Sequence, residues 1–156
     1  MRGLASLLAR SRRSAAGGEC GSALIETSLA YMLGMAMVLG IIEFAMMCYT
    51  FGVVSEAART GVRYAVMHGS DSSVCSGPTT GCTDFTGANV VARVDAFAAT
   101  FAKNRSAMAV TVTYPDSAST PPSRVVVSIA YTYVPLFTIS STGHVFHVTE
   151  QGRIVY

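Results

Sequence analysis

The sequence predicts an α+β protein in which a long N-terminal helix packs on a small antiparallel sheet of about three strands, with one additional helix. Residues 22–67 contain no proline and are strongly apolar, as expected of one long helix. Three later runs rich in Val, Ile, Thr and Tyr have the character of strands. Because a sheet must bury one face, we expect the second half of the long helix to cover it.

The 156 residues have room for one small domain in addition to this helix. We expect three parts along the chain. They are a basic leader at 1–21, the long helix at 22–68 with a transmembrane first half, and an extracytoplasmic α+β domain at 69–156.

The leader is rich in Ser, Ala and Gly, and we expect it to be disordered or transiently helical. Removing it takes away four of the 11 basic groups and one of the nine acidic groups, which leaves a net charge of −1. No basic surface then remains to suggest nucleic-acid binding. Positive charge stays on the cytoplasmic side of a membrane, so the N-terminus is expected inside. The charged residues of the leader are Arg2, Arg10, Arg12, Arg13 and Glu19.

The first half of the long helix, residues 22–42, is apolar on all sides. Only 13% of the chain is charged, and the apolar excess is concentrated between Ala23 and Val66. This pattern predicts a membrane segment instead of an unusually large core. A cleaved secretory signal would have an apolar core of about 7–15 residues followed by a small-residue cleavage site. The run here is longer and has no clear site of that kind, which favours an anchored protein.

The second half of the long helix, residues 43–67, is amphipathic. Glu56 and Arg59 lie three apart on a second face, as expected of an ion pair. The whole helix would be roughly 65–70 Å long, and the hydrocarbon core of a bilayer is only about 30 Å thick, so the second half should stand outside the membrane. The apolar residues at spacings of three and four are Phe44, Met47, Phe51, Val54, Ala58, Val62 and Ala65.

The remaining elements follow from local patterns. Gly69 is placed to act as a C-cap for the long helix. A loop dense in Ser, Thr, Gly and Asp then leads to the second amphipathic helix. The predicted elements are a loop at 70–87, a helix at 88–103, strands at 107–114, 124–134 and 144–156, and loops at 115–123 and 135–143.

Glu26 is the one charged residue within the apolar segment. A carboxylate costs about 2.5 kcal/mol or more at the centre of a bilayer, so a role for it is plausible. One interpretation is that Glu26 lies at the cytoplasmic interface, partly solvated and without a role. Under the other, a peptidase cuts after Gly21 and gives Ser22 a charged amine, one helical turn from the carboxylate. Glu26 would then neutralise the amine of a neighbouring subunit inside an apolar bundle.

The sequence Gly-Ser-Ala-Leu-Ile-Glu at 21–26 resembles the processing site of type IV prepilins and pseudopilins, which have Glu at the fifth mature position. The passage Ile-Ile-Glu-Phe at 41–44, followed by 54–65, is similar to the TadE-like branch. That branch consists of minor pilins or pseudopilins of tight-adherence (Flp, type IVb) pilus systems. Thr27 stands where this branch often has an aromatic residue, which argues more against a major pilin than against a TadE-like protein.

The resemblance implies a pilin-like fold and a pilus-assembly protein that is not an enzyme and needs no cofactor. A prepilin peptidase would cut after Gly21, leaving Ser22 as the new terminus. The helix would then pack into a tight-adherence pilus or its initiating complex. The implied partners are the membrane, the peptidase, other pilin or pseudopilin subunits and the assembly machinery. The implied location is the cytoplasmic (inner) membrane, single-pass, with the N-terminus inside and the C-terminus outside.

The alternative is an uncleaved single-pass membrane protein whose extracytoplasmic domain binds a ligand or partner. Small residues four apart would help helices to approach closely in the first case. Such pairs occur at Ala30 with Gly34 and at Ala36 with Gly40. Ordinary membrane composition explains them equally well, because Gly and Ala are common in membrane helices.

Cys75 and Cys82 lie in one polar loop that should face an oxidising compartment, and we expect them to form a disulfide. A zinc site would need more ligands than this loop offers, since His68 is the only nearby histidine. His144 and His147 are three apart on a predicted strand, so they should point to opposite faces. We therefore predict no metal site.

No Ser-His-Asp, Cys-His or paired-carboxylate arrangement stands out, and there is no glycine-rich phosphate loop. This argues against an enzyme. We interpret the remaining aspartates as solvated groups of loops or helices. They are Asp71, Asp84, Asp95 and Asp116.

Overall fold

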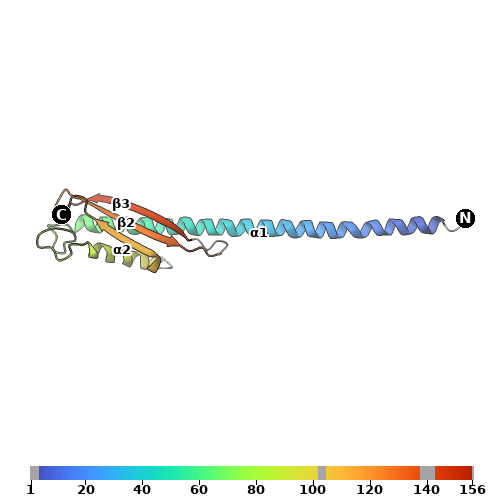
Figure 1. Cartoon of the computed structure of the whole chain (residues 1–156), viewed down its shortest axis with the longest axis horizontal. Coiled ribbons are helices and arrows are strands. Elements are labelled where there is room, and N and C mark those ends of the chain that lie inside the picture. The colour runs from blue at the N-terminus through green and yellow to red at the C-terminus, as the bar shows by residue number, and fades with distance from the viewer. Residues whose placement is uncertain (1–3, 102–104, 138–142, 156) are drawn as a thin grey trace. The chain divides into compact units, whose positions relative to one another are not determined.

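The computed structural model describes residues 4–101, 105–137 and 143–155, and within them the side chains of 21–99, 106–137 and 143–155 (Figure 1). The predicted α+β class is confirmed. The elements in chain order are α1 (Leu4–Met67), α2 (Ala88–Phe101), the 3₁₀ turn η1 (Arg105–Ala107), β1 (Met108–Thr113), β2 (Arg124–Tyr133) and β3 (His144–Arg153).

The chain divides into two compact units, Met1–Phe44 and Ala45–Tyr156, and α1 contributes to both. The helix begins at Leu4, so the backbone of most of the leader is helical. Leu, Ala and Arg, which are good helix formers, are common there and proline is absent. The last two residues of the predicted helix 88–103, residues 138–142 of the predicted loop 135–143, and the last residue of the third strand lie outside the described residues.

The end of α1 at Met67 agrees with the prediction, but the cap is different. Gly69 lacks the positive φ of a glycine C-cap, so that expectation was wrong. His68 closes the helix instead, because its Nδ1–H donates to the carbonyl oxygen of Tyr64 at 2.9 Å. The two rings also stack, with centroids 4.0 Å apart. A histidine in this place satisfies a carbonyl that the last turn leaves without a partner.

The sheet has the order β1-β2-β3, and both pairs of neighbours are antiparallel. At one end of the β2–β3 ladder Tyr133 pairs with His144, and at the other Arg124 pairs with Arg153. A predicted ion pair is also confirmed. Arg59 Nη1 lies 3.1 Å from Glu56 Oε1, and its Nε donates to Glu150 Oε1 on β3 at 3.3 Å. These exposed contacts contribute little to stability in water.

The third strand is shorter than predicted, because the chain leaves the ladder after Arg153. The N–H of Ile154 donates to the carbonyl oxygen of Ser123 at 2.9 Å, and that of Val155 to Val66 at 3.2 Å. Ile154 itself is buried. The last described residues therefore join the sheet to the end of α1.

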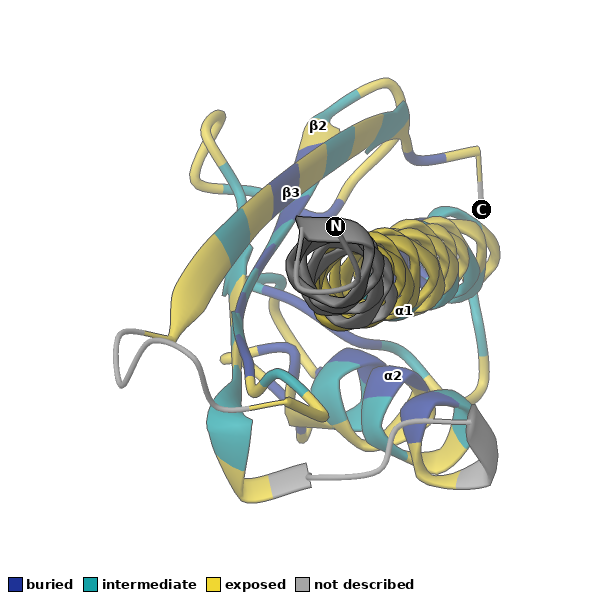
Figure 2. Cartoon of the chain, turned by 90° about the vertical axis from the view of Figure 1, so that its right-hand side faces the viewer, coloured by how far each residue is buried: buried dark blue, intermediate teal, exposed yellow. Residues whose placement is uncertain are grey.

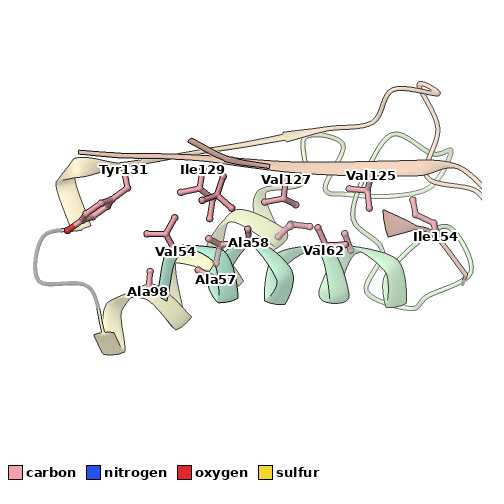
Figure 3. Close-up of a cluster of buried hydrophobic side chains, with 14 of the residues drawn as sticks. Val54, Ala57, Ala58, Val62, Ala98, Val125, Val127, Ile129, Tyr131 and Ile154 are labelled. Atoms are coloured by element: carbon pink, nitrogen blue, oxygen red, sulfur yellow. The ribbon is translucent and has the colours of Figure 1, made fainter. Parts of the chain in front are cut away.

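The core lies between one face of the sheet and the two helices, which cover the same side (Figure 2). Alternate residues of β2 are buried, as expected of a strand with one covered face. In the predicted stripe of α1, Val54, Ala58 and Val62 are buried beneath β2 (Figure 3). Ala65 is also buried, whereas Phe51 stays 48% exposed. The buried apolar side chains of the three main elements are Val54, Ala57, Ala58, Val62 and Ala65 of α1, Val90, Val94 and Ala98 of α2, and Val125, Val127, Ile129, Tyr131 and Tyr133 of β2.

Gly61 marks the closest approach of α1 to its neighbours. A Cβ atom at this position would overlap Cγ2 of Val94 on α2 and would lie 3.5 Å from Cγ1 of Val127 on β2. The glycine therefore lets three elements meet at one point. Gly52, two and a half turns earlier on the same helix, has no such neighbour within 4 Å.

Gly61→Ala should lower the free energy of unfolding by about 1–3 kcal/mol, because the added methyl overpacks the core. Gly52→Ala is the matched control and should raise it by about 0.5–1 kcal/mol, since alanine is the better helix former in open space. Denaturation of the full chain in detergent micelles, followed by tyrosine near-UV circular dichroism, measures both. Equal stabilisation by the two substitutions would contradict the close packing at Gly61.

Candidate functional site

The first unit presents an exposed apolar helix surface. Every large apolar side chain from Leu24 to Ile42, apart from Leu39, is between 44% and 76% exposed. The helix from Gly21–Met67 is long and apolar enough to cross a membrane, and none of its most apolar stretch is buried. A continuous apolar surface of this size requires a cover of lipid or of other helices.

Glu26 is the only charged side chain between Ser22 and Ile42. The polar residues that follow it are satisfied within the helix. Thr27 Oγ1 donates to the carbonyl oxygen of Ala23 at 2.7 Å, and Ser28 Oγ to that of Leu24 at 2.8 Å. The exposed carboxylate of Glu26 has no hydrogen bond or ion pair to any residue that the structure describes. Its partner in an apolar environment must therefore come from outside the helix.

Gly21 and Ser22 are exposed and lie within the continuous helix. A Cβ atom at Gly21 would meet nothing within 4 Å, so the glycine has no packing role in this chain. Ser22 and Glu26 are four residues apart and therefore share one face of the helix. In the uncut chain the nitrogen of Ser22 is an amide, so a charged pair between these positions requires cleavage of the preceding bond.

The small residues of the span are all exposed, and a Cβ atom at Gly34 or Gly40 would meet nothing within 4 Å. Ala30 and Gly34 form one open patch, and Ala36 and Gly40 form another. The second pair is displaced by six residues, which turns it about 120° around the helix axis. The two patches therefore face different directions, as would suit contacts with more than one neighbouring helix.

In the second unit, the loop before α2 contains the predicted cysteine pair. Cys75 and Cys82 are joined by a disulfide, and their Cα atoms are 5.6 Å apart. Cys82 is buried, whereas Cys48 on α1 is free and exposed. The disulfide closes the loop directly before Asp84, which connects it to the start of α2.

The prediction that Asp84 is a solvated loop residue is wrong, because Asp84 is only 9% exposed. Its Oδ1 accepts a hydrogen bond from the N–H of Ala88 at 2.7 Å. Its Oδ2 accepts from the N–H of Asn89 at 2.8 Å and from the hydroxyl of Ser76 at 2.6 Å. Asp84 thus caps the first turn of α2. An aspartate shortly before a predicted helix was the available signal.

Burial alone would raise the pKa of Asp84. The hydrogen bonds from Ser76 and from the backbone of Asn89 and Ala88 outweigh it and lower the pKa. Asp116 is also paired: Arg124 donates to its Oδ1 at 2.9 Å and lowers the pKa of Asp116 to about 2. Both carboxylates therefore stay ionised at neutral pH and act as structural acceptors. Neither has the raised pKa that a general acid would need.

Among the described residues, no group of three or more His, Cys, Asp or Glu side chains is placed to hold a metal ion. His144 and His147 are both exposed, and they pair across the sheet with Tyr133 and Ala130. Positions three apart on a strand point to opposite faces, so these two rings do not converge.

The apolar helix and its carboxylate are also where the chain resembles known proteins. Residues 21–63 match the family model of TadE-like proteins. The resemblance seen at 21–26, 41–44 and 54–65 is therefore confirmed over most of this stretch. The match begins at Gly21 and ends within the part of α1 that packs on the sheet. Comparisons with curated proteins and with solved structures found no match.

Asp84→Asn should lower the free energy of unfolding at pH 7 by about 1–2 kcal/mol, because the cap of α2 is weakened. The folded-state pKa of Asp84 is depressed below 3.8, so its contribution is present above that value and is lost as the pH falls through the folded pKa. The difference in the free energy of unfolding between the variant and the wild type should therefore become smaller in acid. Denaturant unfolding between pH 7 and pH 3 measures it.

Asp71→Asn is the matched control, because Asp71 lies in the same loop but is exposed. Asp71→Asn should change the free energy of unfolding by no more than about 0.5 kcal/mol. A loss at Asp84 no larger than the loss at Asp71 would contradict the capping role.

Proposed function

We propose that this chain is a pilus-associated membrane protein, a TadE-like minor pilin or pseudopilin of a tight-adherence pilus. The observation that carries the proposal is where the family match begins. It starts at Gly21, the proposed residue before the cut, and continues along the exposed apolar helix with its single carboxylate. The protein is then a substrate of a prepilin peptidase and a structural subunit, with no chemistry of its own.

Two features support insertion with the N-terminus inside. Four arginines precede the span, and such charges remain on the cytoplasmic side. The disulfide between Cys75 and Cys82 lies on the other side of the span and suits an oxidising compartment. Together they favour an anchor in the cytoplasmic membrane and an outer domain in the extracytoplasmic space.

The proposed assembly step uses the carboxylate of Glu26. After cleavage, Ser22 carries a charged amine in an apolar environment that offers no water to solvate it. An isolated charge of this kind is expensive in a membrane, and the same holds for the carboxylate. When subunits pack side by side, the amine of one meets the carboxylate of another, and each offsets the burial cost of the other. The pair then sets the axial register between neighbouring helices.

The rest of the helix supplies the packing. Without a hydrophobic driving force in lipid, helices associate where small residues let their backbones approach. The open patches at Ala30 with Gly34 and at Ala36 with Gly40 face different directions, which suits a bundle more than a dimer. The charged pair would supply register, and the patches would supply close contact.

Intact-mass measurement of the membrane-extracted protein tests the processing. The mature chain should begin at Ser22 and be lighter by the mass of residues 1–21. Gly21→Leu should remain at full length, because the peptidase is proposed to recognise the glycine before the cut. The fold should be unaffected, since a Cβ atom at Gly21 would meet nothing within 4 Å. A wild-type chain that still begins at Met1 would instead favour the uncleaved single-pass protein with an outer binding domain.

Glu26→Ala should reduce co-purification with the other pilus subunits by about tenfold or more, because an unpaired amine left in an apolar bundle costs about 3 kcal/mol or more. Glu43→Ala is the control, since it removes the other carboxylate at the opposite end of the span. It should leave co-purification within about twofold of wild type, as most surface changes do. If Glu26→Ala assembles like wild type while cleavage continues, the carboxylate has no part in assembly.

A further inference from the structure

One end of the outer unit carries several exposed apolar side chains, which we call the apolar rim. It consists of Phe51 on α1 with Val134, Leu136, Phe137 and Val145 at the ends of β2 and β3. Each of these side chains is between 42% and 59% exposed. The ring of Phe51 lies edge-on to that of Phe146 on β3, with centroids 5.9 Å apart. The helix and the hairpin are therefore in contact at this end.

The end of β2 and the start of β3 lie towards the N-terminal side of the part of α1 that packs on the sheet (Figure 1). Phe51 and Phe146 lie at the same level, and His144, paired with Tyr133, is two strand residues nearer that end. Two residues of strand advance about 7 Å, which equals about five residues of helix. Tyr133 and His144 therefore lie near the level of Met46 on α1.

That level coincides with the expected outer edge of the hydrocarbon. A span needs about 20 residues. Counted from Ser22 it ends near Ile41, and counted from the residue after Glu26 it ends near Met46. The outer leaflet's interfacial layer then covers the next few residues of α1. The apolar rim falls within this layer or at its border.

At this end, neither α1 nor the hairpin of β2 and β3 contains a charged residue. Residues 44–55 of α1 contain no Asp, Glu, Lys or Arg, and neither does the sequence 125–149, which includes the whole hairpin connection. The ion pair of Glu56 with Arg59 begins one turn further along α1. The pair of Asp116 with Arg124 lies at the opposite end of β2. Along α1 and the hairpin, charged residues therefore begin only beyond the apolar rim, whereas Arg105, in the turn before β1, lies at the same end of the sheet as the apolar rim.

We propose that the apolar rim is a second membrane contact, by which the outer domain rests in the interfacial layer of the bilayer that α1 crosses. Half-exposed aromatic and aliphatic side chains without charge suit this layer, where an apolar face can leave water without entering the hydrocarbon fully. Tyr49 on α1, 56% exposed, adds an aromatic residue of the kind enriched there. The inference rests on the proposed membrane span.

This contact would hold the unassembled subunit against the membrane and limit its rotation about α1. Leaving the membrane for a filament would expose the apolar rim to water unless a neighbouring subunit covers it. The same surface would therefore link membrane release to assembly.

The chain contains no tryptophan, so single-tryptophan reporters can test the contact directly. Phe137→Trp reports on the apolar rim and Leu33→Trp on the span. Phe85→Trp, in the loop before α2, is the matched control, because Phe85 is 58% exposed at the other end of the unit. Each full-length variant is reconstituted at low density in phosphatidylcholine vesicles, with and without acyl-brominated lipid.

Brominated lipid should quench the tryptophan fluorescence of Phe137→Trp severalfold more than that of Phe85→Trp. The emission of Phe137→Trp should also be shifted to the blue. Leu136→Trp provides a second reporter if Phe137→Trp does not fold. Quenching of Leu33→Trp with none at Phe137 or Leu136 would overturn the apolar-rim contact and leave the span intact. Blue-shifted emission without quenching would show that protein covers the apolar rim, and would also overturn it. Absence of quenching at Leu33 would overturn the span and this inference together.

Discussion

The packing of α1 against the inner face of β2 is the contact on which the rest of the outer unit depends. The helix meets the strand through small residues, among which Ala58 and Gly61 are buried. Small side chains bring the backbones close, and Val94 of α2 then fills the space that a Cβ at Gly61 would need. A tightly packed core has no free volume to absorb a larger residue there. The sizes of a few side chains on one helix therefore determine where α2 and the sheet lie.

The same helix is apolar along most of its length, yet its two halves serve different environments. Upstream of Ile42 the apolar side chains are large, point in all directions and are exposed. From Val54 onward the buried face is built largely from alanine, glycine and valine. Lipid tolerates any arrangement of large apolar groups, whereas a sheet requires a close and specific fit. The two halves therefore differ in the size of the apolar side chains they present, and the second half also carries a charged face.

Much of the fold could be predicted because the decisive patterns are local. The helix ending at Met67 and the strands that begin near Met108, Arg124 and His144 follow from spacing and from loop residues. The errors concern individual hydrogen bonds that the local sequence pattern does not reveal. Ile154 leaves the third strand because its N–H bonds to Ser123, and no periodicity near the end of the chain reveals that partner. His68 replaces the expected glycine cap through a side-chain hydrogen bond that depends on its rotamer.

The candidate site was accessible from the sequence for a related reason. Gly21 and Glu26 are five residues apart, so a short motif identifies them, and TadE-like proteins match this same stretch. Asp84 was missed because its role depends on three donors brought together by the folded loop. Ser76 lies within the segment that the disulfide closes, and Ala88 and Asn89 lie after it at the start of α2. Composition alone made Asp84 look like any other loop aspartate.

The carboxylates of Asp84 and Glu26 differ in whether their own chain supplies them with hydrogen-bond donors. Asp84 is buried, and its charge is balanced by donors from its own chain, so folding alone satisfies it. Glu26 lies in a segment that calls for an apolar environment, and the described part of the chain offers it no donor. A charge in such a place favours whichever state brings it a partner. For Asp84 that state is the folded chain, whereas for Glu26 the state that we propose is an assembly in which a second subunit supplies the amine.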